Sequence, residues 1–510
     1  MKKALVVVLA LSLVSCVFVS RRVEVTSVST RKPVTVKSSV KAHLKDGSTI
    51  VYINGVTVTA DALVGRGYRY DLTLSESKSV DRVPLSGVLG METFRTRVNA
   101  TESIIFSSLA SAGAVVATAA LAVAIFGSCP TVYSDDGRVE EAELFSNSIA
   151  PLLEDRDIDR LHARPDANGS VILEVRNEAM ETHYINHLEL LEVEHAVDAR
   201  VVPDADGSLL VLESLQPPFS AVNRRGRDVG ELLARADGRA YKTDRRALDG
   251  VSAADMDDWI DFSIPIDPGA STAALAFRLR NSLLSTVLLY DVMLAPAGAA
   301  ALEWLGDDLA RISTVVELGR WHRRRAGLHV SVWDNGTYRE VTRIPDSGPI
   351  MWDEMAIVVP VPAGERDLRV RLSFIADYWR LDQVRVSFDV KTAQSRPIPL
   401  AEVTGRDGRP DRDALATMST PDERYLQTSP GQKFTTRFQT ERERPGRSRT
   451  FLLSSQGYYS EWIRGSWIQN ATATEPFRPT DEAIVTAMRK WAAKRDAFEK
   501  QFTRARVPVQ

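Results

Sequence analysis

The sequence predicts a mainly β protein that contains several domains. Its 510 residues exceed what one hydrophobic core normally supports, and a hydrophobic content of 44% is sufficient for proper cores. Short alternating runs recur along the chain, separated by Asp-Gly or Asn-Gly pairs that supply the positive φ angles of tight hairpins. This spacing favours antiparallel sheets over parallel α/β units. Such pairs begin at Asp46, Asn54, Asp136, Asn168, Asp206, Asp237, Asp249, Asn335 and Asp407.

The N-terminus carries a short apolar run behind two lysines. Residues 4–19 are uncharged but fall short of the ~20 residues that a bilayer-spanning helix needs. The run contains Leu13-Val14-Ser15-Cys16, which resembles the lipobox of bacterial lipoprotein signals. The resemblance implies removal of residues 1–15 and lipidation of Cys16, which makes the lipid bilayer a partner. A cleaved ordinary signal peptide and an uncleaved anchor helix are the alternatives.

The segment after Cys16 is expected to be a tether followed by a small domain. Val17 stands next to the cysteine in place of Asp, which by the same resemblance favours the outer membrane, with the inner membrane as the alternative. Residues 16–32 are rich in Ser, Thr and basic side chains without a helical stripe, as in an extended tether. Residues 33–100 alternate over short runs and predict a small β-barrel.

Residues 104–126 form an uncharged segment rich in Ala, Val and Ser. As a helix this segment would extend roughly 34 Å at ~1.5 Å per residue, enough to cross a hydrocarbon core. Its small residues also suit close helix packing. Three interpretations stay open: a hydrophobic helix buried in protein or in an oligomer, an element inserted without full crossing or as part of a pore, and a true transmembrane helix.

The rest of the chain is expected to form antiparallel β-sandwich domains and one terminal helix. We expect a β domain at 127–250, a β extension with loops at 396–475, and an amphipathic helix at 480–505 capped by Thr480. In 251–395, Leu368–Phe374 and Val384–Asp389 alternate strictly, and this passage resembles the closing strands of galactose-binding-like jelly rolls.

Three local features within these domains are predicted. Asn335-Gly336 should connect a hairpin formed by residues 330–333 and 338–344. Residues 171–176 and 188–194 should pair across a loop at 177–187. One amphipathic helix should interrupt 251–395, because four apolar residues recur there at helical spacing. These are Leu302, Leu305, Leu309 and Ile312.

Charge and cysteine content exclude some classes of protein. The net charge is −3, with 64 basic and 67 acidic residues, and no long basic run marks a nucleic-acid site. Only two cysteines are present, and lipidation of Cys16 would leave Cys129 without a partner in its own chain. Disulfides are therefore not expected to stabilise the fold.

Candidate site residues are few. His183 and His187 have the spacing of metal ligands on a helix, but the surrounding pattern is strand and loop, so they are weak candidates and we expect no metal or other cofactor. All nine tryptophans lie in the second half of the chain, and four rings gather near its end. Flat rings beside polar groups suit sugar stacking, whereas core packing is their commoner use. These rings belong to Tyr458, Tyr459, Trp462 and Trp467.

The whole pattern resembles a family of uncharacterised bacterial lipoproteins. The resemblance rests on the lipobox, the small barrel, the Ala-rich segment, Ser128–Ser134 and Gly457–Trp462. It implies a lipid-anchored envelope protein and no particular activity. Because no catalytic motif is found, we expect a non-catalytic scaffold or binding module with protein partners or envelope glycan. A carbohydrate- or peptidoglycan-binding protein is the alternative, and an envelope hydrolase comes third.

Overall fold

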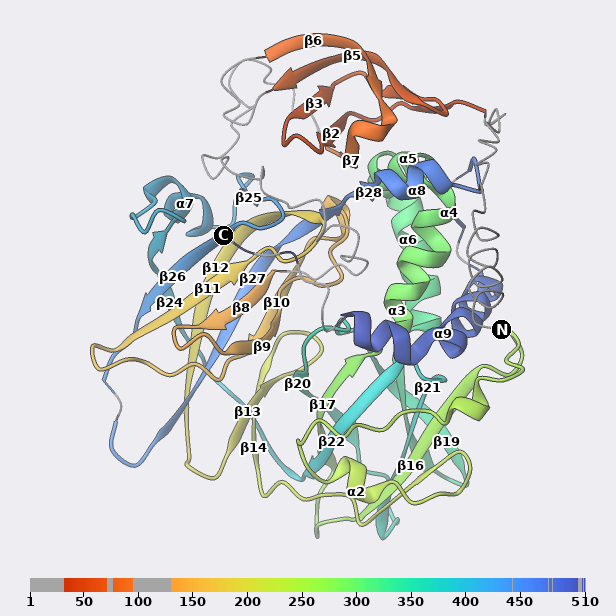
Figure 1. Ribbon diagram of the computed structural model, residues 1–510. Helices are drawn as coiled ribbons and strands as arrows, with labels where there is room; N and C mark the ends of the chain where they lie inside the picture. Colours follow the sequence, from red (N-terminus) through yellow and green to blue (C-terminus); the bar gives the residue numbers. More distant parts are fainter. Residues whose placement is uncertain are drawn as a thin grey trace, which may run out of the picture. The chain divides into compact units, whose positions relative to one another are not determined.

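The computed structural model describes residues 32–70, 77–94, 130–442, 444–475, 477–478, 480–502, 507 and 509 (Figure 1). The predicted signal peptide, Cys16, Cys129 and the hydrophobic segment 104–126 lie outside these ranges. Within them the chain is mainly β, as predicted, and its named strands pair antiparallel. Residues 33–510 form one compact unit.

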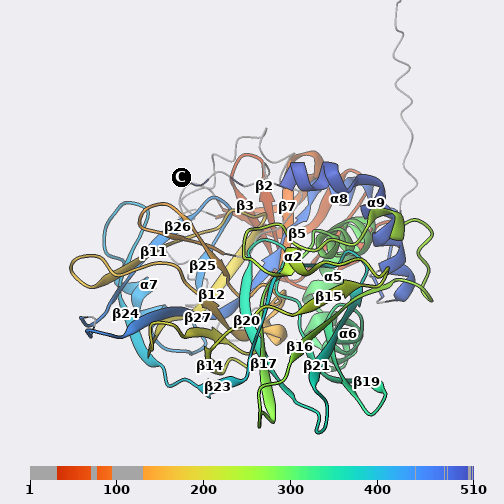
Figure 2. The same ribbon diagram turned by 90° about the horizontal axis from the view of Figure 1, so that it is seen from below.

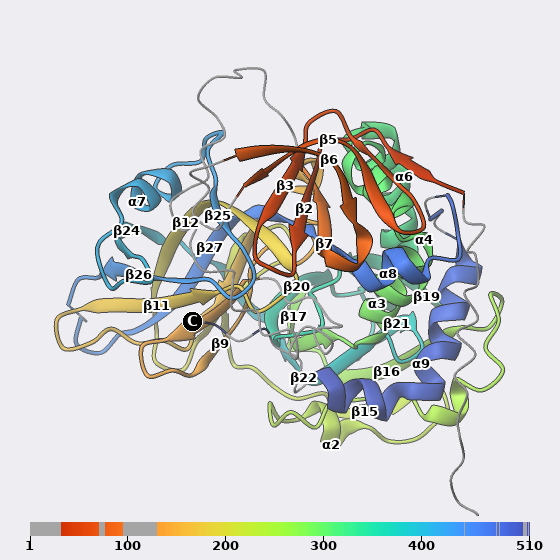
Figure 3. The ribbon, with the colours of Figure 1, turned by 45° about the horizontal axis from the view of Figure 1, so that its top comes forward.

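The predicted N-terminal barrel is present as an eight-stranded sheet in the order β1-β4-β5-β3-β2-β7-β28, with β6 beside β5 (Figure 3). Its interior is filled by fully buried side chains such as Val40, Ile50, Tyr52 and Leu63. One strand, β28 (Ile463–Arg464), comes from the far end of the chain, which the sequence did not predict. The others are β1 (Val34–Val36), β2 (Val40–Leu44), β3 (Thr49–Tyr52), β4 (Val56–Val58), β5 (Ala62–Tyr70), β6 (Ser77–Pro84) and β7 (Val88–Thr93).

The largest sheet has nine strands in the order β10-β27-β12-β24-β26-β11-β8-β9, with β25 beside β12. Its strands come both from 127–250 and from 396–475, so these two predicted segments share one sheet and one core. The strands are β8 (Thr131–Ser134), β9 (Val139–Glu143), β10 (Asp155–Arg160), β11 (Ser170–Arg176), β12 (Glu181–His195), β24 (Arg396–Thr404), β25 (Leu426–Thr428), β26 (Lys433–Gln439) and β27 (Ser448–Glu461).

Two long strands dominate this sheet. β12 and β27 pair along nearly their whole length, with a bulge between Ile185 and His187 (Figure 1). The predicted loop at 177–187 is therefore wrong from Glu181 onward. The predicted pairing of 171–176 with 188–194 is also wrong, because β11 pairs with β8 and β26. Pairing with strands that are distant in the sequence is therefore preferred over the hairpin that adjacent segments would form.

The segment 251–395, for which a sandwich was predicted, contributes to a five-stranded sheet, β15-β16-β21-β18-β19, and a three-stranded sheet, β20-β17-β22 (Figure 2). One of these strands, β15, lies before the predicted start of the domain. The predicted hairpin is confirmed: β18 and β19 pair, and Asn335 and Gly336 take φ angles of 49° and 84°. The strands are β15 (Ser220–Asn223), β16 (Asp257–Pro265), β17 (Thr272–Asn281), β18 (Leu328–Asp334), β19 (Thr337–Ile344), β20 (Asp353–Pro360), β21 (Asp367–Ile375) and β22 (Trp379–Ser387).

A further three-stranded sheet, β13-β14-β23, contacts β20 of the sandwich and β10 and β12 of the large sheet. Its strands are β13 (Arg200–Pro203), β14 (Leu209–Glu213) and β23 (Asp389–Thr392). Two short helices, α2 (Gly230–Leu233) and α7 (Arg412–Met418), lie in the connections; Asp411 caps α7 through two backbone N–H groups.

The single amphipathic helix predicted within 251–395 is a chain of short helices instead. Leu302, Leu305 and Leu309 are buried, but Ile312 is 72% exposed because the helix breaks before it. The segments are α3 (Leu284–Thr286), a π-helix (Val287–Leu294), α4 (Ala295–Ala297), α5 (Ala300–Gly306) and α6 (Ile312–Arg325), with α8 (Gly465–Asn470) beside α4.

The C-terminal helix, α9 (Asp481–Phe502), agrees closely with prediction. Thr480 accepts the N–H of Ala483 through Oγ1 at 3.2 Å, as an N-cap residue does. Ile484, Met488 and Trp491 are buried on one face, in the same core as the sandwich and the π-helix. The apolar partner of this helix therefore lies in its own chain.

By length and composition, no single described helix meets the requirement for a bilayer-spanning helix. One bent pair, Leu284–Ala297 with Ala300–Ala310 at 117°, meets it jointly. Many of the pair's apolar side chains are buried in the protein core.

Candidate ligand-binding site

Of the four rings proposed from sequence as a stacking platform, two are buried and two are half-buried. Tyr459 and Trp462 are 6% and 5% exposed, and Tyr458 and Trp467 are half-buried. Tyr458 stacks on Tyr184 with ring centroids 4.6 Å apart. The two half-buried rings, Tyr458 and Trp467, thus keep only part of their surface exposed to solvent.

The other two rings of this group are also engaged. The Trp462 indole N–H donates to Thr182 Oγ1 at 2.9 Å, and its ring lies 3.7 Å from the imidazole of His43. The Arg464 guanidinium covers Trp467 at 4.3 Å.

The two candidate metal-binding histidines take different roles. His183 is fully buried in β12, and its Nε2 lies 2.8 Å from Glu181 Oε1. Burial lowers the pKa of His183 to about 3, so the ring is neutral at physiological pH. His187 follows the bulge, is only half-buried, and belongs to no candidate metal-binding group in the described part of the chain.

A buried carboxyl pair lies beside His183. Glu181 and Glu461 are 1% and 2% exposed, and Tyr290 donates its hydroxyl to Glu461 Oε2 at 2.9 Å. Burial first, and Glu181 as a like charge, raise the pKa of Glu461 to about 8, against the opposing effect of Arg464. Two carboxyls can perform acid–base chemistry only where a substrate reaches them, and these two side chains are enclosed.

One group of possible metal ligands is close-packed. Glu141, His162 and Glu354 place one ligand atom each within 4.8 Å of one another. Both carboxylates are already committed to arginines: Glu141 pairs with Arg278, while Glu354 pairs with Arg160 and Arg200. This arrangement is an ion-pair network, in which a metal would have to displace guanidinium groups.

A polar cavity of about 360 Å³ opens at one end of the sandwich. This volume is within the range of small-molecule sites. Its lining contains five aspartates, three arginines and the hydroxyls of Tyr241 and Thr243. The polar lining residues are Asn223, Arg224, Arg225, Tyr241, Thr243, Asp244, Arg246, Asp249, Asp255, Asp257 and Asp258.

Four of the eight charged side chains that line the cavity form ion pairs with one another. Asp258 is buried and accepts hydrogen bonds from Tyr241 and Thr243 at 2.7 Å each. Asp244 pairs with Arg225 at 3.2 Å. Arg224 pairs with Asp255 at 2.9 Å and donates to the Asp257 carbonyl at 2.6 Å.

The outer face of the five-stranded sheet continues from the cavity. The pattern of β16 alternates strictly, so that Trp259 and Asp261 point away from the core. Arg371 of β21 lies opposite Asp261 and binds it with two hydrogen bonds of 2.7 Å. Trp333 and Tyr338 face each other across β18 and β19, with ring centroids 5.1 Å apart. We call these five residues the outer face.

Arginine joins the cavity to the outer face. The Arg224 guanidinium lines the cavity and lies 4.7 Å from the Trp259 ring centroid. Arg371 lies 5.0 Å from Trp259 and 4.3 Å from Tyr338. The cavity and the outer face are therefore one continuous surface of rings, guanidinium groups and carboxylates.

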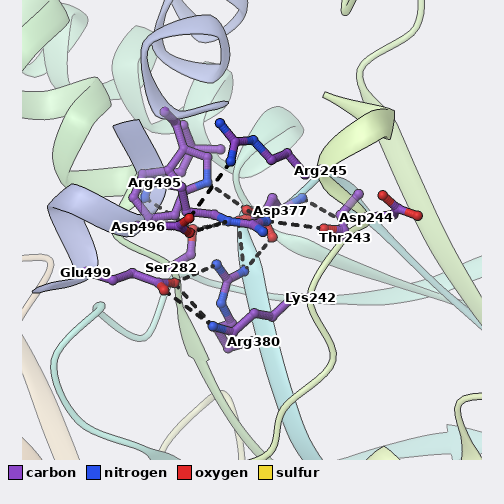
Figure 4. A network of polar contacts seen from close by, with 12 residues as sticks. Lys242, Thr243, Asp244, Arg245, Ser282, Asp377, Arg380, Arg495, Asp496 and Glu499 are labelled. Atoms are coloured by element: carbon purple, nitrogen blue, oxygen red, sulfur yellow. Dashed lines mark hydrogen bonds and ion pairs between the residues drawn. The ribbon is translucent and has the colours of Figure 1, made fainter. Parts of the chain in front are cut away.

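A buried network of hydrogen bonds and ion pairs connects the wall of the cavity to α9 (Figure 4). Thr243 Oγ1 donates to Asp258 and accepts the Asp377 backbone N–H at 2.8 Å. Asp377, fully buried, accepts from Arg380 at 2.8 Å and from Arg495 at 3.2 Å. The Trp491 indole N–H donates to Asp377 at 2.7 Å. In Figure 4, Asp377 lies between Thr243 and the two arginines.

Sequence inspection missed this site for an identifiable reason. Its residues come from β15, from the segment between β15 and β16, and from strands β16, β18, β19 and β21. The alternation of 368–374 predicts a strand, but the outward positions of that strand are Arg369, Arg371 and Ser373 and include no aromatic ring. The pairing register between the strands brings Trp259, Arg371 and Tyr338 together, and this register cannot be predicted from the sequence pattern.

No protein-family model matches this chain, and no curated protein matches it. Among solved structures, one match is the C-terminal CBM6 of LamC, a marine laminarinase from Zobellia galactanivorans: 13% identity, 39% of this chain, 98% of that chain, TM-score 0.14. A GH31 alpha-xylosidase from Xanthomonas citri matches with 9% identity, 83% and 38% coverage, and TM-score 0.15. An uncharacterized protein from Listeria monocytogenes has 15% identity, 51% and 22% coverage, and TM-score 0.14. Scores this low establish no function for this chain.

Proposed function

We propose that this chain is a non-catalytic carbohydrate-binding protein of the bacterial envelope. The observation that carries the proposal is the continuity of the polar cavity with Trp259 through Arg224. A sugar presents hydroxyl donors around a ring whose C–H faces pack on flat aromatic surfaces. The cavity offers carboxylate acceptors, and next to it lies the half-buried ring of Trp259, which Arg224 and Arg371 also contact.

Charge pairing favours a neutral, hydroxyl-rich ligand. Asp261 is neutralised by Arg371, and Asp244 by Arg225. A surface whose charges are compensated attracts a polyanion only weakly. The paired carboxylates and guanidinium groups still have free lone pairs and N–H groups, and these can form hydrogen bonds with sugar hydroxyls. Carboxylates exceed guanidinium groups in the cavity lining, which further disfavours nucleic acid.

The envelope location depends on the lipobox at Leu13–Cys16. A lipidated Cys16 would hold the protein at a membrane and keep its sandwich close to envelope glycan. Labelled-palmitate incorporation tests this part, because Cys16→Ala should abolish labelling. Equal incorporation into both proteins would refute lipidation and leave glycan binding to be judged separately.

Affinity electrophoresis in gels that contain single soluble polysaccharides, with a peptidoglycan pull-down beside it, tests binding. We expect at least one glycan to retard the protein. Trp259→Ala should reduce its affinity by at least about tenfold, equivalent to about 1.4 kcal/mol. Trp352→Ala is a matched control, because Trp352 is a half-buried ring stacked with Arg278 and Arg280, away from the outer face. Absence of retardation by every glycan would refute the proposal.

A further inference from the structure

Nearly half of the cavity lining comes from one stretch of chain with little regular structure. Residues 241–251, which we call the cavity loop, supply seven of the fifteen lining residues. Apart from one short 3₁₀ helix, Arg245–Ala247, the cavity loop contains no named helix or strand. Backbone groups outside regular structure need other partners, so the shape of this loop depends on the elements packed against it.

Two arginines of α9 bind the backbone of the cavity loop. Arg495 Nη1 donates to the Thr243 carbonyl at 3.4 Å. Arg489 Nη2 donates to the Val251 carbonyl at 3.3 Å. The arginines stand six residues apart, ~9 Å along the helix axis, and their acceptors lie near opposite ends of the loop. One helix therefore holds both ends of the cavity loop.

Two ion pairs add to these contacts (Figure 4). Lys242 Nζ lies 3.3 Å from Glu499 Oε1, and Arg245 Nη1 lies 3.8 Å from Asp496 Oδ2. Both pairs are partly exposed to solvent, so each stabilises the contact only weakly. They nevertheless fix the side of α9 that faces the loop, because Glu499 and Asp496 lie on the same part of the helix as Arg495.

Buried hydrogen bonds continue from α9 to a carboxylate of the cavity. The Trp491 indole and the Arg495 guanidinium both donate to the Asp377 carboxylate. The Asp377 backbone N–H donates to Thr243 Oγ1, and the Thr243 hydroxyl donates to Asp258 Oδ2 at 2.7 Å. Asp377 and Asp258 are 0% and 5% exposed, so water competes little for these bonds. A displacement of α9 would therefore also displace a hydrogen-bond donor of Asp258.

We propose that α9 holds the cavity loop in its ligand-binding shape, with Arg489 and Arg495 as positioning residues. Neither arginine lines the cavity, so each acts on a ligand only through the loop. The choice of a glycan as ligand rests on the function proposed above. Coupling between two sites is reciprocal, so a ligand in the cavity should in turn stabilise α9.

Hydrogen exchange of the ligand-free, full-length protein, followed by mass spectrometry, tests the hold of α9 on the loop. Arg489→Met and Arg495→Met should each speed exchange in the cavity loop at least about fivefold, while the nine-stranded sheet keeps its wild-type rates. Arg489 is exposed, so Arg489→Met keeps the test usable if Arg495→Met does not fold. Lys494→Met, at an exposed position of the same helix, is the matched control and should exchange as wild type. Wild-type exchange of the loop in both arginine variants would overturn the proposal, whether or not a glycan binds.

Calorimetric titration with an oligosaccharide from the most retarding polysaccharide tests the coupling to the ligand. Both arginine variants should bind it at least about fivefold more weakly than wild type and Lys494→Met do. The bound oligosaccharide should also slow exchange in α9 of the wild-type protein, an effect that a merely structural role of the arginines would not produce.

Two results with a ligand that binds would overturn the proposal and leave glycan binding intact. They are wild-type affinity in both arginine variants, and unchanged exchange of α9 when the oligosaccharide is bound. If no oligosaccharide binds, the proposed function fails, and the ligand-free exchange alone decides whether α9 holds the loop.

Discussion

Trp462 lies flat on the imidazole of His43, with ring centroids 3.7 Å apart and ring planes 4° apart. His43 belongs to β2 of the N-terminal sheet, whereas Trp462 stands between β27 and β28 at the far end of the chain. The contact joins the N-terminal sheet to residues that lie far away in the sequence. The stability of this sheet should therefore depend on the C-terminal part of the chain.

Replacement of Trp462 should destabilise the fold. Trp462→Ala removes a nearly buried ring and the hydrogen bond to Thr182, and we expect a loss of about 3–5 kcal/mol. Chemical denaturation followed by circular dichroism measures it. Trp352→Ala, at a half-buried ring, should cost clearly less; equal losses would contradict the interior role of Trp462.

The Glu461 carboxyl should make stability fall with rising pH. Its folded-state pKa is raised to about 8, above the ~4.3 of an exposed glutamate, so folding favours the neutral form. This contribution is complete below pH ~4.3 and is lost as pH rises through 8. The unfolding temperature should therefore decline between about pH 4.3 and about pH 8 and level off above that.

Glu461→Gln should flatten that decline, because an amide keeps the neutral shape without a titration. Glu402→Gln is the control. Arg437 lowers the pKa of the Glu402 carboxyl, so this group causes no loss of stability at high pH, and its replacement should leave the decline unchanged. If Glu461→Gln has the same slope as wild type from about pH 4.3 to about pH 8, another group causes the decline.

The Asp377 carboxylate should hold α9 in place. Asp377→Asn keeps a residue that tolerates its φ of 63°, but leaves Arg380 and Arg495 without their buried counter-charge. Removal of one member of a buried ion pair costs about 3–5 kcal/mol. We expect faster proteolytic cleavage near α9, measured by limited trypsin digestion and mass spectrometry. Cleavage at the wild-type rate would contradict the network.

Gly67 should be intolerant of a side chain. A Cβ there would lie 2.7 Å from both Ile50 and the Tyr52 ring inside the N-terminal sheet. Gly67→Ala should cost about 1–3 kcal/mol through overpacking. Gly87→Ala, where a Cβ meets nothing within 4 Å, is the control. Equal unfolding midpoints for the two variants would contradict this prediction, because they would show that the interior of the sheet accommodates a Cβ atom at position 67.

Local chemistry made part of the fold predictable. Asn335-Gly336 encodes its own turn, because both residues tolerate positive φ, and the hairpin followed. Thr480 and the apolar stripe of α9 were likewise sufficient to place that helix. Each of these features depends on neighbours within a few residues.

Long-range pairing made the rest unpredictable. Glu181 pairs with Glu461, so the predicted loop at 177–187 became strand, and the rings near Tyr458 became core. Trp259 and Tyr338 reach Arg371 only through the order β16-β21-β18-β19. The hydrophobic periodicity of the sequence does not reveal this strand order. The candidate site depends on the order.

Calorimetric titration of an oligosaccharide from the most retarding polysaccharide into the full-length protein tests the central claim most directly. We expect saturable binding at one site, weakened at least about tenfold by Arg224→Ala, because that side chain joins the cavity to Trp259. Trp352→Ala should bind as wild type. Binding that Arg224→Ala leaves unchanged, or no binding heat with any oligosaccharide, would contradict the account.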